Sequence, residues 1–231
     1  MEACRVALGF LTALPGGRVP ADAAAFRRAA PCFPWVGAVL GGLFYLAARL
    51  LWAFFPPGVA GALMLGVWLG LTGMLHLDGL LDVADALLPP ADRTRRLAIL
   101  KDPSIGAFAL GVGGVYLLAK AQALAALGPD PALVAAPALA RFFVLPASRL
   151  ASARPGGLGD GVRGAPIGGA LLPALAAALL FPLPALASTV AAAGLYALAL
   201  RRLGGVTGDV HGAAIEIAEL AFLLFALPRG V

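Results

Sequence analysis

The chain has 231 residues, of which 61% are hydrophobic and only 13% are charged. Because soluble domains carry roughly 25% charged residues, this composition excludes an ordinary soluble domain and indicates a polytopic membrane protein. The net charge of +5 does not indicate a nucleic-acid partner, since the basic residues fall in short loops between apolar runs, where membrane orientation and lipid headgroups account for them.

The apolar runs predict an all-α, polytopic membrane bundle of about six or seven transmembrane helices, with amphipathic or re-entrant segments beside them. We expect a single membrane-embedded catalytic domain over residues 1–231. Residues 6–15 form an apolar run too short to span a bilayer, so they predict an interfacial or re-entrant segment. The predicted spans are 36–55, 59–75, 104–127, 131–146, 167–181, 185–200 and 210–227.

Glycine pairs with GxxxG spacing, Gly37 with Gly41 and Gly66 with Gly70, indicate close helix packing and are compatible with a homodimer. With the amino terminus in the cytoplasm, most basic residues fall on the cytoplasmic side of these spans. This asymmetry follows the positive-inside rule and predicts a multi-pass protein of the bacterial inner membrane whose active site faces the cytoplasm.

Three aspartates interrupt the apolar residues 72–88: Asp78, Asp82 and Asp85. On a helix that advances about 100° per residue, the three carboxylates lie within roughly 40° of one another and share one face. Three neighbouring negative charges repel one another, and a bound cation relieves that repulsion. We therefore expect a metal site at a membrane edge.

A second acidic cluster falls within residues 204–220 and contains Asp209, Glu216 and Glu219. Asp209 and Glu216 lie roughly 20° apart around a helix, so Glu216 joins the candidate metal ligands. Both glutamates enter an apolar span, where an ionised carboxylate is costly unless it is paired or bound to metal. An alternative is that either glutamate neutralises Arg141 or remains protonated.

Two loops carry candidate phosphate-binding groups. The glycine-rich residues before Asp209 include Thr207 and Gly208 and would expose backbone N–H groups at the start of a helix, where anions bind favourably. Lys101 and Asp102 also precede a predicted helix start, although a solvated loop would explain them equally well.

The histidines and cysteines give weaker signals. We expect His76 and His211 to be hydrogen-bonded structural groups rather than metal ligands or proton carriers. Cys4 and Cys32 are distant in sequence and belong to no CxxC pair or Cys/His cluster, so we predict two unpaired thiols.

Carboxylates beside basic residues at the inner membrane face indicate Mg²⁺, because this ion prefers oxygen ligands and pairs with substrate phosphates. The chemistry that this arrangement favours is phosphoryl or nucleotidyl transfer. The residues by themselves do not name a substrate.

The motifs, taken in order, resemble those of the cobalamin synthase family, which is adenosylcobinamide-GDP ribazoletransferase. The resemblance spans nearly the whole chain and rests on these segments: FLTALP at 10–15, FPWVG at 33–37, HLDGL at 76–80 with Asp82 and Asp85, Lys101-Asp102 with Ile105-Gly106, ARP at 153–155 with GLG at 157–159, and GGVTGD at 204–209. Leu81, Ala86 and His211 depart from the usual pattern.

The resemblance implies a Mg²⁺-dependent enzyme of vitamin B12 biosynthesis. It would transfer the cobinamide-phosphoryl group of adenosylcobinamide-GDP to the 5′-hydroxyl of α-ribazole, or of its 5′-phosphate, giving adenosylcobalamin, or its phosphate, and GMP. Asp78, Asp82, Asp85 and Asp209 would hold metal at the diphosphate, and one of them would act as the base. Lys101 and Arg154 would neutralise phosphate charge.

Two other classes remain as alternatives. A CDP-alcohol phosphotransferase uses a similar membrane-edge metal site, but its signature requires Ala-Arg three and four residues after Asp-Gly, where this chain has Asp82-Val83. An ion or solute transporter would explain carboxylates in a membrane span. Aspartates gathered at one face beside basic loops favour a reaction at the surface over a conduit.

Overall fold

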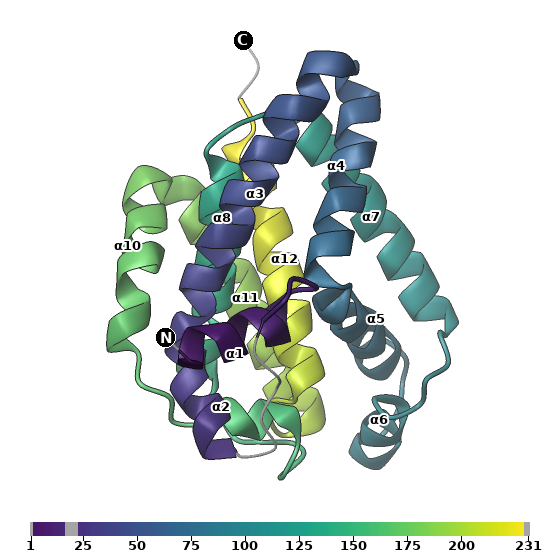
Figure 1. Cartoon of the computed structure of the whole chain (residues 1–231). Coiled ribbons are helices and arrows are strands. Elements are labelled where there is room, and N and C mark those ends of the chain that lie inside the picture. Colours follow the sequence, from purple (N-terminus) through teal and green to yellow (C-terminus); the bar gives the residue numbers. More distant parts are fainter. Residues whose placement is uncertain (1, 17–22, 229–231) are drawn as a thin grey trace.

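A computed structural model describes residues 2–16 and 23–228, and its described part is a helical bundle (Figure 1). The helices are α1 (Glu2–Leu11), α2 (Ala23–Ala29), α3 (Phe33–Phe54), α4 (Pro57–Thr72), α5 (Leu75–Leu87), α6 (Arg93–Ile99), α7 (Ala107–Leu127), α8 (Ala132–Phe142), α9 (Val144–Ala147), α10 (Leu171–Leu180), α11 (Pro182–Leu203) and α12 (Gly208–Ala226). The short 3₁₀ helices are η1 (Ala30–Cys32), η2 (Leu158–Val162) and η3 (Gly168–Ala170).

The all-α membrane bundle predicted from the sequence is confirmed, and each predicted span overlaps helical residues. Among the described residues, the helices long and apolar enough to cross a membrane are Ala24–Phe54, Ala107–Leu127 and Pro182–Leu203, and the pair α4 and α5 adds a fourth candidate if it is one broken span. The apolar segments Ala132–Ala147 and Gly168–Leu180 are shorter. Large apolar side chains lie exposed on the outer helices, among them Leu179 at 81% and Leu110 at 72%. Such an exposed apolar surface is what lipid would cover.

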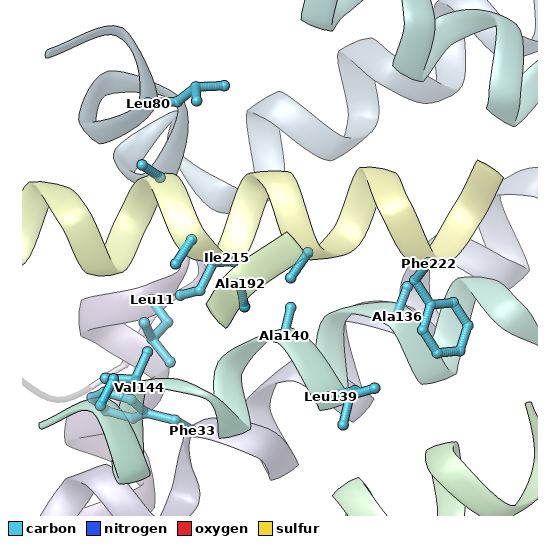
Figure 2. Close-up of a cluster of buried hydrophobic side chains, with 14 of the residues drawn as sticks. Leu11, Phe33, Leu80, Ala136, Leu139, Ala140, Val144, Ala192, Ile215 and Phe222 are labelled. Carbon is cyan, nitrogen blue, oxygen red and sulfur yellow. The ribbon is translucent and has the colours of Figure 1, made fainter. Parts of the chain in front are cut away.

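Helix α12, yellow in Figure 1, lies inside the bundle and packs against α5, α7, α8 and α11. Its buried residues include Gly212, Ala213, Ala214 and Ala218, whose small side chains let neighbouring backbones approach closely. Figure 2 shows part of the apolar core along this helix, from Ile215 to Phe222. The other elements are therefore arranged around α12.

A sharp bend of 94° separates α4 from α5. Gly73 ends α4 with φ of 60°, and Met74 follows with φ of 58°, a left-handed conformation that is uncommon for a residue with a side chain. At the other end of α5, the Arg96 guanidinium donates hydrogen bonds to the carbonyls of Ala86 (2.6 Å) and Leu87 (2.9 Å). These contacts fix the direction of α5, which carries the aspartate face, at both of its ends.

Cys4 and Cys32 form a disulfide, so the prediction of two unpaired thiols was wrong. The residues are 28 apart in sequence, but α1 packs against η1 and the start of α3, which brings their Cα atoms to 5.3 Å. Cysteine spacing along the chain carries no information about this packing. The bond ties α1 to the segment that leads into α3.

Candidate active site

The two acidic segments converge where α5 crosses α12. A Cβ atom on Gly79 of α5 would lie 2.7 Å from the carbonyl oxygen of Asp209, which is closer than real Cβ contacts, so only glycine permits this approach. Asp78 and Asp209 line one cavity as a result. The structure thus brings residues from two distant parts of the sequence to one cavity.

A third segment reaches the same cavity through backbone pairing. Ser152 forms an isolated parallel bridge with Val206, in which the Ala153 N–H donates to the Val206 carbonyl at 3.0 Å. This pairing holds residues 151–153 beside the segment that leads into α12. It places Ser152 and Arg154 on the cavity wall.

The amino terminus of α12 forms another part of the wall. The Thr207 hydroxyl caps the helix by accepting a hydrogen bond from the Val210 N–H at 3.3 Å, and it donates to the Asp209 carboxylate at 3.2 Å. Gly208 also lines the cavity. A helix amino terminus favours negative charge, so this position suits a phosphate group, as the sequence predicted.

The carboxylates at this crossing act on one another. Asp82 experiences the negative charges of Asp78, Asp209 and Asp85 together with the positive charge of Arg154. In the part of the chain that the structure describes, none of these aspartates forms an ion pair within 4.0 Å. Their negative charge is therefore not neutralised by a close cationic side chain of the protein.

Fewer carboxylates lie close enough to share a metal ion than the sequence predicted. Within the described ranges, no three His, Cys, Asp or Glu side chains are gathered closely enough to hold a metal ion by themselves. Mg²⁺, however, is typically held by one or two carboxylates together with substrate phosphates. Asp78 and Asp209 are oxygen donors on one cavity and fit that mode of binding.

Asp85 lies at a different junction from Asp78 and Asp209. Its carboxylate accepts hydrogen bonds from the backbone N–H groups of Gly106 (2.6 Å) and Ala109 (2.9 Å), at the start of α7. Both oxygens of Asp85 thus satisfy backbone donors that a helix start leaves without partners. This carboxylate anchors α7 to α5.

Lys101 and Asp102 lie on an exposed loop outside the cavity wall. The Asp102 carboxylate accepts a hydrogen bond from the Ser104 N–H at 3.0 Å, and this contact with Ser104 lowers the pKa of Asp102. Arg154 donates to the carbonyl of Leu100, the residue before Lys101, at 3.3 Å. The loop therefore adjoins the site through Arg154.

Glu216 and Glu219 lie deeper along α12, in a buried network of charges. Lys120 of α7 contacts Glu216 at 2.8 Å and Glu219 at 2.9 Å, and Arg141 of α8 contacts Glu219 at 2.6 Å. Tyr116 donates a hydrogen bond to Glu216, and the Trp68 indole donates to Glu219 at 3.1 Å. The structure thus separates Glu216 from the aspartates and bears out the alternative that Glu219 neutralises Arg141.

Sequence reasoning missed Lys120 and Tyr116 in this network. The signal for Lys120 was present, because a lysine within an apolar span requires a partner and thereby marks the adjacent carboxylates as that partner. Tyr116 carried no comparable signal. Its position at i−4 from Lys120 gains meaning only once α7 packs against α12.

The cavity has a volume of about 200 Å³ and a mixed lining. Its aromatic wall comes from α1, α2 and the start of α3, where the rings of Phe10, Phe26 and Phe33 pack against one another. Figure 2 shows Leu11, Phe33, Val144 and Ile215 grouped at one end of the apolar cluster. The site therefore combines an apolar wall with the aspartates and Arg154.

Both histidines also line this cavity. His211 lies 3.0 Å from the Tyr196 hydroxyl through Nδ1, while its buried Nε2 has no hydrogen-bond partner among residues 2–16 and 23–228. His76 is buried as well, and neither of its ring nitrogens has a partner in these ranges, so the prediction that it is a hydrogen-bonded structural group was wrong. Of the three aspartates of α5, Asp78 lines the cavity together with this histidine.

Comparison with known proteins finds relatives over nearly the whole chain. A family model described as cobalamin-5-phosphate synthase matches residues 3–227. The adenosylcobinamide-GDP ribazoletransferase of Deinococcus radiodurans is 44% identical over 97% of this chain and 85% of its own length. The enzyme of that name from Pseudomonas aeruginosa strain UCBPP-PA14 is 44% identical over 95% of both chains, and that from Halorubrum lacusprofundi is 40% identical over 96% and 95%. No solved structure is significantly similar to the chain. The chain belongs to the cobalamin-5-phosphate synthase family.

Proposed function

We propose that this protein is an adenosylcobinamide-GDP ribazoletransferase, which transfers the cobinamide-phosphoryl group to α-ribazole or its 5′-phosphate and releases GMP. The observation that carries the proposal is the shared cavity of Asp78, Asp209 and Arg154 at the crossing of α5 and α12. The names of relatives that are 44% identical over nearly the whole chain support this choice of substrates. Neither a CDP-alcohol phosphotransferase nor a transporter is favoured by these comparisons.

The side chains that line the cavity have different roles in such a reaction. Arg154 and the amino terminus of α12, with Thr207 and Gly208, face the phosphate groups and offset their negative charge. One of the aspartates at the crossing of α5 and α12 takes the proton from the attacking hydroxyl. The hydroxyl oxygen forms the new bond to the phosphorus nearest the cobinamide, and the bond from that phosphorus to the GMP oxygen breaks. GMP departs with the electron pair.

The attacking oxygen is a ring hydroxyl of the ribose, in place of the 5′-hydroxyl expected from the sequence. The family description names a product that carries a 5-phosphate. A 5′ oxygen that already bears phosphate has no proton to lose and no free hydroxyl to form the new bond. A secondary hydroxyl of the ribose serves both α-ribazole and its 5′-phosphate.

We propose Asp78 and Asp209 as the protein ligands of Mg²⁺, with Asp82 beside them. When bound there, the ion would supply positive charge that offsets the diphosphate oxygens. Asp85 and Glu216 are left out of this set, because their carboxylates already bind the start of α7 and Lys120 respectively.

The proposed location is the inner membrane, with the cavity facing the cytoplasm. Its support is the distribution of basic residues, among them Arg154, Arg201 and Arg202, near the same end of the bundle as the site. The apolar outer helices provide the surface that contacts lipid.

The test is a turnover assay on the purified protein in lipid nanodiscs. GMP and a corrinoid product should form together, and only when adenosylcobinamide-GDP, α-ribazole and Mg²⁺ are all present. Formation of GMP without α-ribazole would indicate hydrolysis, and full activity in the presence of a chelator would contradict the metal proposal. Solute flux without turnover would favour a transporter.

A further inference from the structure

The lining of the cavity indicates which of the two substrates enters it. A volume of about 200 Å³ falls below the roughly 300–1,000 Å³ of typical ligand pockets, so the cavity suits a small aromatic group and cannot enclose a corrin ring. Much of the wall is apolar, with Phe26 exposed by 4% and Phe33 by 2%. Such a wall offers few hydrogen-bond partners to a flat ring.

The two aromatic bases of the substrates, benzimidazole and guanine, differ in how many hydrogen-bonding groups they would bring into the cavity. The benzimidazole base of α-ribazole has a single free ring nitrogen, N3, which accepts a hydrogen bond. Guanine carries several donors and acceptors along its edge, and leaving them unpaired against the aromatic wall of Phe10, Phe26 and Phe33 would cost free energy for each. The apolar wall therefore suits benzimidazole better than guanine.

His211 provides one suitable donor. Its side chain is 5% exposed, and its Nδ1 lies 3.0 Å from the Tyr196 hydroxyl. His211 lines the cavity, and its Nε2 has no hydrogen-bond partner in the part of the chain that the structure describes. The described structure gives the Tyr196 hydroxyl no acceptor other than Nδ1. A hydroxyl that donates to Nδ1 leaves the proton of the neutral imidazole on Nε2, so that Nε2–H is a donor at the cavity.

We propose that this cavity is the subsite for the aromatic base of α-ribazole, with the His211 Nε2–H donating a hydrogen bond to N3 of the base. This proposal rests on the proposed function. The apolar residues of α1, α2 and α3 contact the flat base, and the ribose hydroxyls extend toward Asp78 and Asp209. Tyr196 is a positioning residue, because it holds the His211 ring without lining the cavity.

The first experiment measures binding without turnover, by equilibrium dialysis of labelled α-ribazole with the protein in nanodiscs. Free 5,6-dimethylbenzimidazole should compete for the site, whereas 5,6-dimethylindole, which has C–H in place of N3, should compete about three- to tenfold more weakly, the usual range for one hydrogen bond. Guanosine should compete poorly. Displacement by guanosine but not by dimethylbenzimidazole would overturn the proposal and assign the cavity to the guanine nucleotide.

Variants locate the hydrogen bond. In His211→Phe, which keeps an aromatic ring, the preference for dimethylbenzimidazole over dimethylindole should disappear, and Tyr196→Phe should reduce it. Tyr45→Phe, at a tyrosine of α3 outside the cavity lining, is the matched control and should retain it. Loss of the preference in His76→Phe together with its retention in His211→Phe would overturn the assignment to His211.

The outcomes separate this inference from the proposed function. If the protein binds α-ribazole with the expected preference but releases no GMP, the proposed function fails and the subsite stands. If GMP and corrinoid product form but dimethylindole competes as well as dimethylbenzimidazole, the function stands and the hydrogen bond to N3 is refuted.

Discussion

Helix α12 carries two groups of carboxylates that have opposite environments. Near its amino terminus, Asp209 lines a cavity together with Asp78 of α5 and has no ion-pair partner among the described residues. Two turns or more along the same helix, Glu216 and Glu219 are buried against Lys120 and Arg141. The charges of Glu216 and Glu219 are balanced by those of Lys120 and Arg141. In the described part of the chain, Asp209 and Asp78 have no such balancing cation in close contact.

The difference shows that carboxylates neutralised inside the bundle are kept apart from carboxylates that remain available at the cavity. A buried carboxylate is tolerated because a cation and hydrogen bonds satisfy it, and removal of either partner leaves an uncompensated charge. A carboxylate without a protein partner at the cavity is available for a metal ion, a phosphate-bound cation or a proton. We therefore expect substitutions in the first group to change turnover and those in the second to change stability.

The largest effect is expected for Asp209→Asn, which removes the charge with little change of shape. Loss of a metal ligand or of the base should lower kcat by about 10²–10⁴-fold. The measurement is GMP release at saturating substrates, with thermal unfolding to confirm the fold. Asp130→Asn is the matched control, because Asp130 caps the start of α8 away from the cavity and should keep normal turnover. Near-normal kcat in Asp209→Asn would refute the assigned role.

Glu219→Gln is expected to act on stability. It leaves Arg141 and Lys120 short of one buried negative charge, and breaking such a pair costs about 3–5 kcal/mol of unfolding free energy. Denaturant unfolding in detergent micelles should show this loss, while kcat per folded molecule stays within a few-fold of the original. A stable variant with abolished turnover would show that the network takes part in the reaction.

The double variant Lys120→Met with Glu216→Gln tests the same network by removing one charge of each sign. Its net charge is unchanged, so it should be more stable than Lys120→Met alone. If the double variant were less stable than Lys120→Met by the full effect of Glu216→Gln, the two side chains would not be coupled, contrary to their 2.8 Å contact.

Gly79→Ala tests the crossing that brings the two helices together. The added Cβ would lie 2.7 Å from the Asp209 carbonyl oxygen, so α5 must shift, at a cost of about 1–3 kcal/mol. The shift should lower kcat/KM about tenfold or more by moving Asp78 from Asp209. Gly66→Ala on α4 is the matched control, since a Cβ there has open space around it and should leave activity unchanged.

The smallest effect is expected for Asp85→Asn, although Asp85 shares a helix face with Asp78. One amide oxygen still accepts from the start of α7, so the loss of stability should be about 1 kcal/mol, the size of a helix cap. The dependence of turnover on Mg²⁺ concentration should not change. An increase in the Mg²⁺ requirement comparable to that of Asp78→Asn would place Asp85 among the metal ligands after all.

The sequence alone determined the membrane class, the approximate positions of the long apolar helices and the family. Apolar runs of helical length are a local property, and the ends of α3, α7 and α11 lie within a few residues of the predicted spans. The acidic face of α5 likewise follows from helix periodicity, and the motifs that surround the aspartates have a fixed order along the chain.

Only the tertiary structure decided which carboxylates face a cavity and which face a cation. Asp82, Asp85 and Glu216 look alike in sequence, but their neighbours differ. Asp85 binds the start of α7 and Glu216 binds Lys120, whereas Asp82 has no ion-pair partner among the described residues. The Cys4–Cys32 bond and the burial of His76 and His211 depend on packing in the same way. The physical reason is that charge compensation and burial are set by neighbours in space, and helix periodicity orients a side chain without specifying what it meets.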